Sequence, residues 1–255
     1  MTHTEDYTMN VYETDELLGQ YLGFHFGESH FGVGNYPARC AGICQELMAG
    51  RDKRRALDLG CAVGRTAFEL GRVFDGVVGM DLSRRFIDAA TTLQKTGEID
   101  YFRRDEGELG ERVTVSLEAL GLARGAGKVS FATGDASHLG PEHVDYDLIF
   151  AGNLIDRLQD PGAFLGDIHK HLVIGGTLVI SSPYTLMEEF TPIANWIGGY
   201  ERNGKPYRVY DGMKEILSHH FEEIQAPADV PFVIRETRRK FQHTIAELSA
   251  WRRTR

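Results

Sequence analysis

Apolar and polar positions along this chain follow two alternating patterns. Short apolar runs of the kind found in buried parallel strands lie at residues 55–60, 77–81, 129–135, 147–153 and 175–183. Between them, apolar side chains recur at helical spacing over residues 66–74, 83–93 and 161–172. This alternation predicts an α/β fold, in which helices cover both faces of a doubly wound, mostly parallel sheet.

Three segments fall outside this alternation. Residues 1–52 carry apolar side chains at helical spacing around a glycine-rich break at residues 27–34, so we expect an N-terminal helical cap. Residues 95–127 and 184–210 are too long for ordinary connections. We expect both to be insertions over the active site, the first with a helix around residues 115–122 and the second forming a lid.

The end of the chain predicts a helix and two further strands, which complete a single domain over residues 1–255. The helix is expected at residues 212–219, and the strands at residues 221–224 and 239–248, with a charged turn between them.

Composition narrows the class of protein. The 37 acidic against 28 basic residues give a net charge of −9, which offers no general attraction to nucleic acid or an anionic membrane. No run approaches the roughly 18 apolar residues of a spanning helix, and the polar start resembles no signal or transit peptide. Three cysteines provide neither a disulfide framework nor a zinc site. We therefore expect a soluble, reduced, cytoplasmic protein that holds no metal.

The strongest local signal is a glycine-rich turn after the first predicted strand. Residues 57–65 read Leu-Asp-Leu-Gly-Cys-Ala-Val-Gly-Arg. Glycines at this position let the backbone approach a ligand, and the carboxyl ends of parallel strands form the binding crevice of open sheets. The spacing differs from the Gly-x-Gly-x-x-Gly that seats a pyrophosphate, and Asp58 would repel such a group. An ordinary glycine turn in an α/β protein is the plainer alternative.

Polar side chains mark the ends of the following strands in the same way. Asp81 ends the second strand, where a carboxylate can accept both hydrogen bonds of a ribose diol. Asp135 ends the third strand, where it could accept from the exocyclic amine of adenine, and Asn153 ends the fourth, beside a reacting centre. Each residue alone could be a helix cap, but together they predict a nucleoside site.

These residues resemble the motifs of the seven-stranded, Rossmann-like, S-adenosylmethionine-dependent methyltransferase family. The resemblance rests on the acid–glycine turn at residues 58–64, on Asp81, on Asp135 and on Gly175-Gly176. Ala62 departs from the family's middle glycine, and a methyl group at this position is tolerated if the local φ is negative.

The resemblance implies S-adenosylmethionine as cofactor, with its methionine part at Gly60 and Gly64, its ribose at Asp81 and its adenine at Asp135. The full set of expected cofactor-binding residues is Tyr21, Asp58, Gly60, Cys61, Gly64, Arg65, Asp81, Leu82, Asp135, Ala136 and Asn153.

A closer similarity extends over nearly the whole chain, to the methyltransferase of ovothiol biosynthesis, a 4-mercaptohistidine π-N-methyltransferase. It rests on the segments at residues 12–15, 21–25, 31–33, 58–66, 106–109, 153–158, 182–185, 189–192, 195–199 and 231–242. It implies methylation of the imidazole π nitrogen of 5-thiohistidine in ovothiol A biosynthesis. That family usually follows an iron-dependent sulfoxide synthase within one polypeptide. We expect this chain to be a stand-alone enzyme paired functionally with a separate synthase.

An amino-acid acceptor needs a cation for its carboxylate and an acid or amide for its ammonium group. We expect catalytic roles for Asn153, Asp156 and Tyr184. The expected substrate-binding residues are Tyr12, Arg157, Glu188, Asn195, Trp196, Arg235, Glu236 and Arg238. For each of these alone, a solvated charge or a packed aromatic ring is an equally good interpretation.

Three other functions remain open at this stage. The donor could serve another small N-, O- or S-nucleophile. The protein could be a nicotinamide oxidoreductase, which the missing Gly-x-Gly-x-x-Gly disfavours. It could also be a non-catalytic subunit that supports the sulfoxide synthase.

Overall fold

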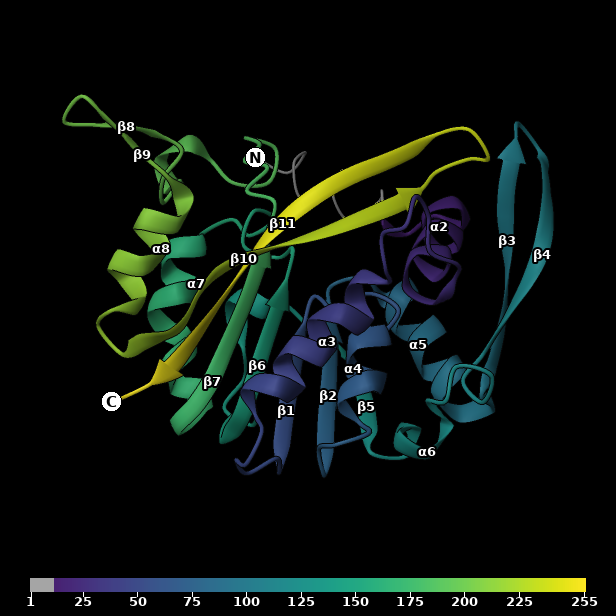
Figure 1. Cartoon of the computed structure of the whole chain (residues 1–255), viewed down its shortest axis with the longest axis horizontal. Helices are drawn as coiled ribbons and strands as arrows, with labels where there is room; N and C mark the ends of the chain where they lie inside the picture. The colour runs from purple at the N-terminus through teal and green to yellow at the C-terminus, as the bar shows by residue number, and fades with distance from the viewer. Residues whose placement is uncertain (1–11) are drawn as a thin grey trace.

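A seven-stranded sheet forms the centre of the computed structural model, which describes residues 12–255 (Figure 1). Its strands follow the spatial order β10-β11-β7-β6-β1-β2-β5, and all neighbours are parallel except the pairs made by β11. The strands are β1 (Arg55–Leu59), β2 (Gly76–Asp81), β5 (Val129–Thr133), β6 (Tyr146–Gly152), β7 (Leu172–Ser182), β10 (Phe221–Arg235) and β11 (Phe241–Arg253). The α/β class predicted from the hydrophobic pattern is confirmed.

Helices cover both faces of this sheet. Along β6, Leu148 and Phe150 belong to one hydrophobic cluster, whereas Ile149 and Ala151 belong to the other. This alternation shows burial on both faces, as expected for a parallel strand. The helices are α2 (Asp15–Phe26), α3 (Tyr36–Leu47), α4 (Arg65–Leu70), α5 (Arg84–Thr96), α6 (Ala123–Ala126), α7 (Pro161–Asp167) and α8 (Val209–Leu217).

The N-terminal helices α2 and α3 lie on the same side of the sheet as α4 and α5 (Figure 1). Asn35 caps α3 by accepting the N–H of Ala38 at 3.0 Å. Its amide nitrogen also donates to the carbonyls of Phe24 and His25, at 3.2 and 2.9 Å. One asparagine therefore joins the end of α2 to the start of α3 and fixes the angle between them.

The first insertion is a β-hairpin, and the helix expected around residues 115–122 is wrong. Strands β3 (Glu98–Glu106) and β4 (Leu109–Ser116) meet at Gly107, which has a φ of +56°. The β-branched run at residues 113–115 suits a strand more than a helix. This hairpin packs on α2, where a Cβ at Gly19 would lie 2.7 Å from the carbonyl oxygen of Phe102.

The second insertion contains a short helical turn (Ile193–Asn195) and a small hairpin of β8 (Tyr200–Arg202) and β9 (Lys205–Tyr207). The last two strands are longer than the sequence predicts. β11 pairs with β7 only over residues 247–252, so residues 230–235 and 241–246 continue as a two-stranded ribbon toward α2 (Figure 1). In the part of the chain that the structure describes, no helix is both long and apolar enough to cross a membrane.

Candidate active site

The loop at residues 60–64 joins the end of β1 to α4 and is held against β2. The N–H groups of Gly60 and Cys61 both donate to the carbonyl of Met80, at 2.8 and 3.0 Å. Gly60 and Gly64 have φ values of +71° and +88°. A Cβ at Gly64 would also lie 2.6 Å from the ring of Phe131, so this position requires glycine for both its conformation and its space.

Ala62 does not have the negative φ at which a methyl group would be tolerated without strain. Its φ is +46°, in the left-handed region that costs an L-residue roughly 1–2 kcal/mol. Its N–H donates to Oδ2 of Asp81 at 2.8 Å, and this bond holds the residue in that conformation. The structure therefore brings the glycine loop and the acid of β2 into direct contact.

Two carboxylates lie beside this loop. Asp58 is 1% exposed, and its Oδ2 has no hydrogen-bond partner among residues 12–255. Burial, reinforced by the charge of Asp81, raises the pKa of Asp58 to about 8. Burial also raises the pKa of Asp81 to about 6, although the N–H of Ser83 donates to its Oδ1 at 2.9 Å. The unpartnered Oδ2 of Asp58 therefore fits a ligand that brings ammonium or hydroxyl protons.

The predicted adenine residues lie along the same edge, because β2 and β5 are paired up to Asp81 and Thr133. Asp135 caps a short helical turn that begins at Ala136, and it accepts from the N–H of Ser137 at 2.8 Å. Burial raises the pKa of Asp135, but the hydrogen bonds from His138 and Ser137 outweigh it and leave the pKa lowered. Leu82, which follows Asp81, has its side chain exposed.

Helix α2 and the segment before it approach this edge. The ring of Tyr21 lies 4.8 Å from that of Phe86 and 6.3 Å from that of Tyr12. The hydroxyl of Ser83 donates to the carbonyl of Tyr12 at 3.4 Å. Burial raises the pKa of Tyr21, so its hydroxyl keeps its proton.

The Arg65 side chain is held by Glu69 and by the backbone of His25. Its guanidinium forms hydrogen bonds to Oε1 of Glu69 at 2.7 and 3.0 Å, and one to the carbonyl of His25. Its backbone N–H points to Nδ1 of His25, 3.4 Å away. Burial and the charge of Arg65 lower the pKa of His25 to about 3, so this histidine is neutral and accepts. Sequence reasoning missed His25, which no spacing links to the loop.

Asn153 anchors the end of β6 with a left-handed φ of +52°. Its N–H donates to the carbonyl of Ser181 at 2.7 Å, and its Oδ1 accepts from the hydroxyl of Tyr36 at 3.0 Å. The Tyr36 hydroxyl lies 2.7 Å from that of Ser181. Tyr36 and Ser181 are a second omission of the sequence analysis, since they meet Asn153 only through the packing of α3 on β6 and β7.

Asp156 and Arg157 follow in the loop after β6. Oδ2 of Asp156 accepts from the N–H of Thr185 and from Nη1 of Arg157, both at 3.1 Å. Its Oδ1 is buried and has no partner in the described part of the chain.

Tyr12 connects this loop to the edge of β2. Burial raises the pKa of Tyr12, whereas the charge of Arg157 and a hydrogen bond to it act in the opposite direction. The charges of Asp81 and Asp156 both raise this pKa as well, so the Tyr12 hydroxyl lies near both carboxylates. The structure therefore brings the predicted Tyr12, Asp156 and Arg157 toward the end of β2.

Tyr184 makes contacts that stabilise its own segment. Its hydroxyl donates to Oε1 of Glu247 at 2.9 Å, and its N–H donates to the hydroxyl of Ser182 at 3.0 Å. Burial and the charge of Glu247 raise its pKa. The Tyr184 hydroxyl is therefore a hydrogen-bond donor at neutral pH and not a base.

The predicted lid residues lie close to one another in sequence but differ in surroundings. Nδ2 of Asn195 donates to the carbonyl of Gln159 at 2.8 Å, and Nε1 of Trp196 donates to that of Thr191 at 2.9 Å. Glu188 is exposed to solvent. Asn195 thus fastens the second insertion to the loop between β6 and α7.

The remaining predicted residues lie at the far end of the β10–β11 ribbon. Nη2 of Arg235 lies 2.5 Å from Oδ1 of Asp105, and the N–H of Arg238 donates to the carbonyl of Asp105 at 3.2 Å. Glu236 pairs with Lys240 and accepts from Gln242. Arg235 and Arg238 thus contact the first insertion, whereas Glu236 contacts residues of its own ribbon.

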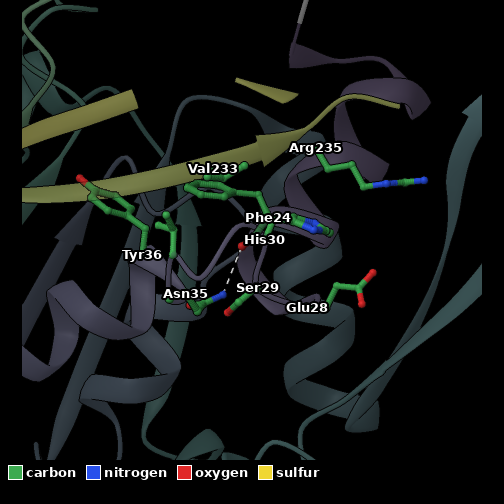
Figure 2. A pocket seen from close by; sticks show the side chains of 11 residues that line it. Phe24, Glu28, Ser29, His30, Asn35, Tyr36, Val233 and Arg235 are labelled. Carbon is green, nitrogen blue, oxygen red and sulfur yellow. Dashed lines mark hydrogen bonds between the residues drawn. The ribbon is translucent and has the colours of Figure 1, made fainter. Parts of the chain in front are cut away.

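Figure 2 shows the small cavity that Arg235 lines together with His30, Asn35 and Tyr36. Its volume of about 20 Å³ suits a single water molecule. It lies between α2 and β10, beside the Tyr36 ring and apart from the glycine loop. Within residues 12–255, no group of three or more His, Cys, Asp or Glu side chains could hold a metal ion.

A family model described as a methyltransferase domain matches residues 34–217. No curated protein gives a significant match.

Solved structures with the same fold include a magnesium protoporphyrin IX methyltransferase from Synechocystis PCC 6803 with bound S-adenosylmethionine. It aligns with a TM-score of 0.59 at 12% identity, over 100% of this chain and 99% of that chain. The N-methyltransferase NodS from Bradyrhizobium japonicum WM9, in complex with S-adenosyl-L-homocysteine, aligns with a TM-score of 0.54 at 15% identity, over 93% and 100%. The cyclase SpnF aligns with a TM-score of 0.59 at 14% identity, over 97% and 96%. At these identities the similarity concerns the fold.

Proposed function

This chain belongs to the methyltransferase domain family, and from that premise we propose that it transfers a methyl group from S-adenosylmethionine to the π nitrogen of 5-thiohistidine. The enzyme class and the methyl donor follow from the family. The acceptor is our proposal and rests on the sequence resemblance together with the chemistry around Asp156.

The observation that carries the cofactor assignment is the buried carboxyl of Asp58, whose Oδ2 has no partner among the described residues. We assign the donor's ammonium group to this oxygen and its ribose diol to Asp81. The loop that contains Gly60 and Gly64 would hold the methionine part, with Tyr21 and Leu82 as further contacts of the donor. Asp135 and Ala136 lie at the end of β5, where the adenine is expected. Cys61 and Arg65 act on the loop itself, through its backbone and through the ion pair with Glu69.

The donor's sulfonium supplies the chemical activation, since the attacking nitrogen's lone pair forms the new N–C bond while the S–C bond breaks and leaves its electron pair on sulfur. The protein's residues must then bind, orient and exclude water. Asn153 contributes by its fixed position, because Tyr36 holds its Oδ1 and Ser181 accepts its N–H.

An amino-acid acceptor presents a cationic and an anionic end. Arg157, in the loop after β6, provides a cation for the anionic end. Its hydrogen bonds to Asp156 and to the carbonyl of Thr185 all use Nη1, so the other guanidinium nitrogens serve Tyr12 and a carboxylate. Arg235 is already paired with Asp105, so we favour Arg157 for this role.

The second insertion would close over this acceptor, with Glu188, Asn195, Trp196 and Tyr184 as its candidate contributors. Glu236 and Arg238 would contribute only if the ribbon bent toward the site. We further propose that an iron-dependent sulfoxide synthase supplies the thiohistidine as a separate protein.

Methyl transfer to 5-thiohistidine and to plain histidine, compared under the same conditions, tests this proposal. We expect turnover with the thiohistidine, the methyl group on the π nitrogen, and at least tenfold lower kcat/KM with histidine. Equal or greater activity with histidine would contradict the assignment of the acceptor. Turnover only with another small N-, O- or S-nucleophile would favour the broader alternative within the same family.

A further inference from the structure

The loop after β6 contains a buried carboxylate, and only one of its two oxygens has hydrogen-bond partners in the described residues. The side chain of Asp156 is 1% exposed. Oδ2 is satisfied by Thr185 and Arg157, whereas Oδ1 has no partner within residues 12–255. A buried acceptor without a donor costs on the order of 1–3 kcal/mol, and more when it is charged. Such an atom at a strand end indicates that a ligand supplies the missing proton.

Three tyrosine hydroxyls lie close enough to Asp156 for its charge to raise their pKa values, but they do not supply the proton that Oδ1 lacks. The single proton of the Tyr36 hydroxyl goes to Asn153, and that of Tyr184 goes to Glu247. Tyr12 lies beside Arg157. Each hydroxyl has only one proton, so the first two cannot also donate to Asp156 in this arrangement.

Resting on the function proposed above, we propose that Oδ1 of Asp156 accepts the N–H of the acceptor's ring and thereby selects the nitrogen that is methylated. A neutral imidazole has one nitrogen with a proton and one with a lone pair. When the protonated nitrogen is held by Asp156, the other one is free to face the methyl donor. The proton stays on its nitrogen during the transfer, and the carboxylate then faces a cationic product.

The same geometry defines the class of acceptor. A carboxylate facing the acceptor favours rings and amines that carry an N–H and repels phenolates and carboxylates. Nη1 of Arg157 donates to Oδ2 of Asp156, so Oδ1 remains for the acceptor. This site therefore suits N-methylation of a neutral or cationic nitrogen compound more than O-methylation of an acid.

Asp156→Asn is the sharpest test, because its carbonyl can keep the bonds from Thr185 and Arg157 while its NH₂ takes the position of Oδ1. The NH₂ group of the asparagine and the N–H of the acceptor's ring, which are both donors, then face each other. We expect 5-thiohistidine to bind at least tenfold more weakly in the presence of S-adenosylhomocysteine, measured by calorimetry, and the product to become a mixture of the two ring isomers. The affinity for S-adenosylhomocysteine itself should stay unchanged. Asp167→Asn, an exposed residue paired with Lys170, is the matched control.

A binding experiment that needs no turnover separates this inference from the proposed function. At a pH where imidazole is neutral, the wild-type complex with S-adenosylhomocysteine should bind imidazole more tightly than 1-methylimidazole, which has no N–H. Asp156→Asn should remove this preference. If wild type shows no such preference, or if the variant keeps it together with its isomer selectivity, the inference is wrong. Failure of wild type to methylate 5-thiohistidine would overturn only the proposed acceptor.

Discussion

Asp58 combines burial, an unfilled acceptor oxygen and a pKa near 8, and this combination predicts a pH effect on cofactor binding. Below pH 8 the carboxyl keeps its proton, so binding of an ammonium group must release it. We expect the affinity for S-adenosylhomocysteine to rise by close to tenfold per pH unit as the pH approaches about 8 from below. Calorimetry in buffers of different ionisation enthalpy measures both the affinity and the released proton.

The same raised pKa affects the unliganded protein in the opposite direction. The pKa of the Asp58 carboxyl is near 3.8 in the unfolded chain and about 8 in the folded protein, so the folded state binds this proton more tightly. The resulting stabilisation of the fold is complete below pH 3.8 and is lost as the pH rises through about 8. Asp58→Asn should remove both dependences. A variant that kept the pH-dependent affinity would show that another group titrates.

Single residues differ in how far the sequence predicts them. The acids Asp58, Asp81 and Asp135 were predictable, because the carboxyl ends of parallel strands meet at one edge. The sign of φ at Ala62 was not, since the bond from its N–H to Asp81 fixes it. His25 was also missed, because its contact with Arg65 spans 40 positions and depends on how α2 packs.

At the scale of elements, the ion pair between Arg235 and Asp105 joins the β10–β11 ribbon to the β3–β4 hairpin. The Arg235 side chain is only 15% exposed, so the pair is partly shielded from water. We expect Arg235→Ala, Asp105→Ala and the double variant to give a coupling free energy of about 1 kcal/mol in urea unfolding. The KM for the acceptor should change little in the single variants. A large rise in KM with Arg235→Ala alone would instead show that this arginine binds the acceptor.

Some elements could be predicted from the sequence and others could not. The strands β1, β2, β5 and β6 follow from short apolar runs, and Ser83 caps α5 as its position indicates. The β3–β4 hairpin was mistaken for a helix in part, because the buried Val115 and Leu122 are seven positions apart, a spacing that also fits a helix. The lengths of β10 and β11 depend on contacts with α2 that no local pattern encodes.

At the scale of the whole molecule, ligand binding to the strand ends should stabilise every element that meets there. S-adenosylhomocysteine at a hundred times its Kd should add about 2.7 kcal/mol, which for a chain of this length raises Tm by about 5–10 °C. Asp81→Ala removes the acceptor for the ribose and for Ala62, so we expect at least tenfold weaker binding and a Tm increase smaller by about 3–5 °C. Differential scanning calorimetry measures both.

Asp88→Ala, an exposed acid on α5, serves as the control for this substitution. Its liganded Tm increase should equal that of the wild type. An unchanged increase in the Asp81 variant would mean that the nucleoside lies elsewhere on the molecule.

The topology of the whole molecule was accessible from the sequence for a physical reason. Parallel strands need crossover helices, and each crossover is right-handed, so the alternation of patterns leaves few arrangements. The path of the β10–β11 ribbon was not accessible, because it leaves the sheet where β11 stops pairing with β7.

This ribbon also determines which part of the protein is exposed to other chains. β10 is the outermost strand of the sheet, so its outer row of backbone groups could template pairing with a neighbouring molecule. Pro227 and Pro231 interrupt that row, since proline has no N–H to offer. The long strand can thus reach across to α2 without becoming an aggregation-prone edge.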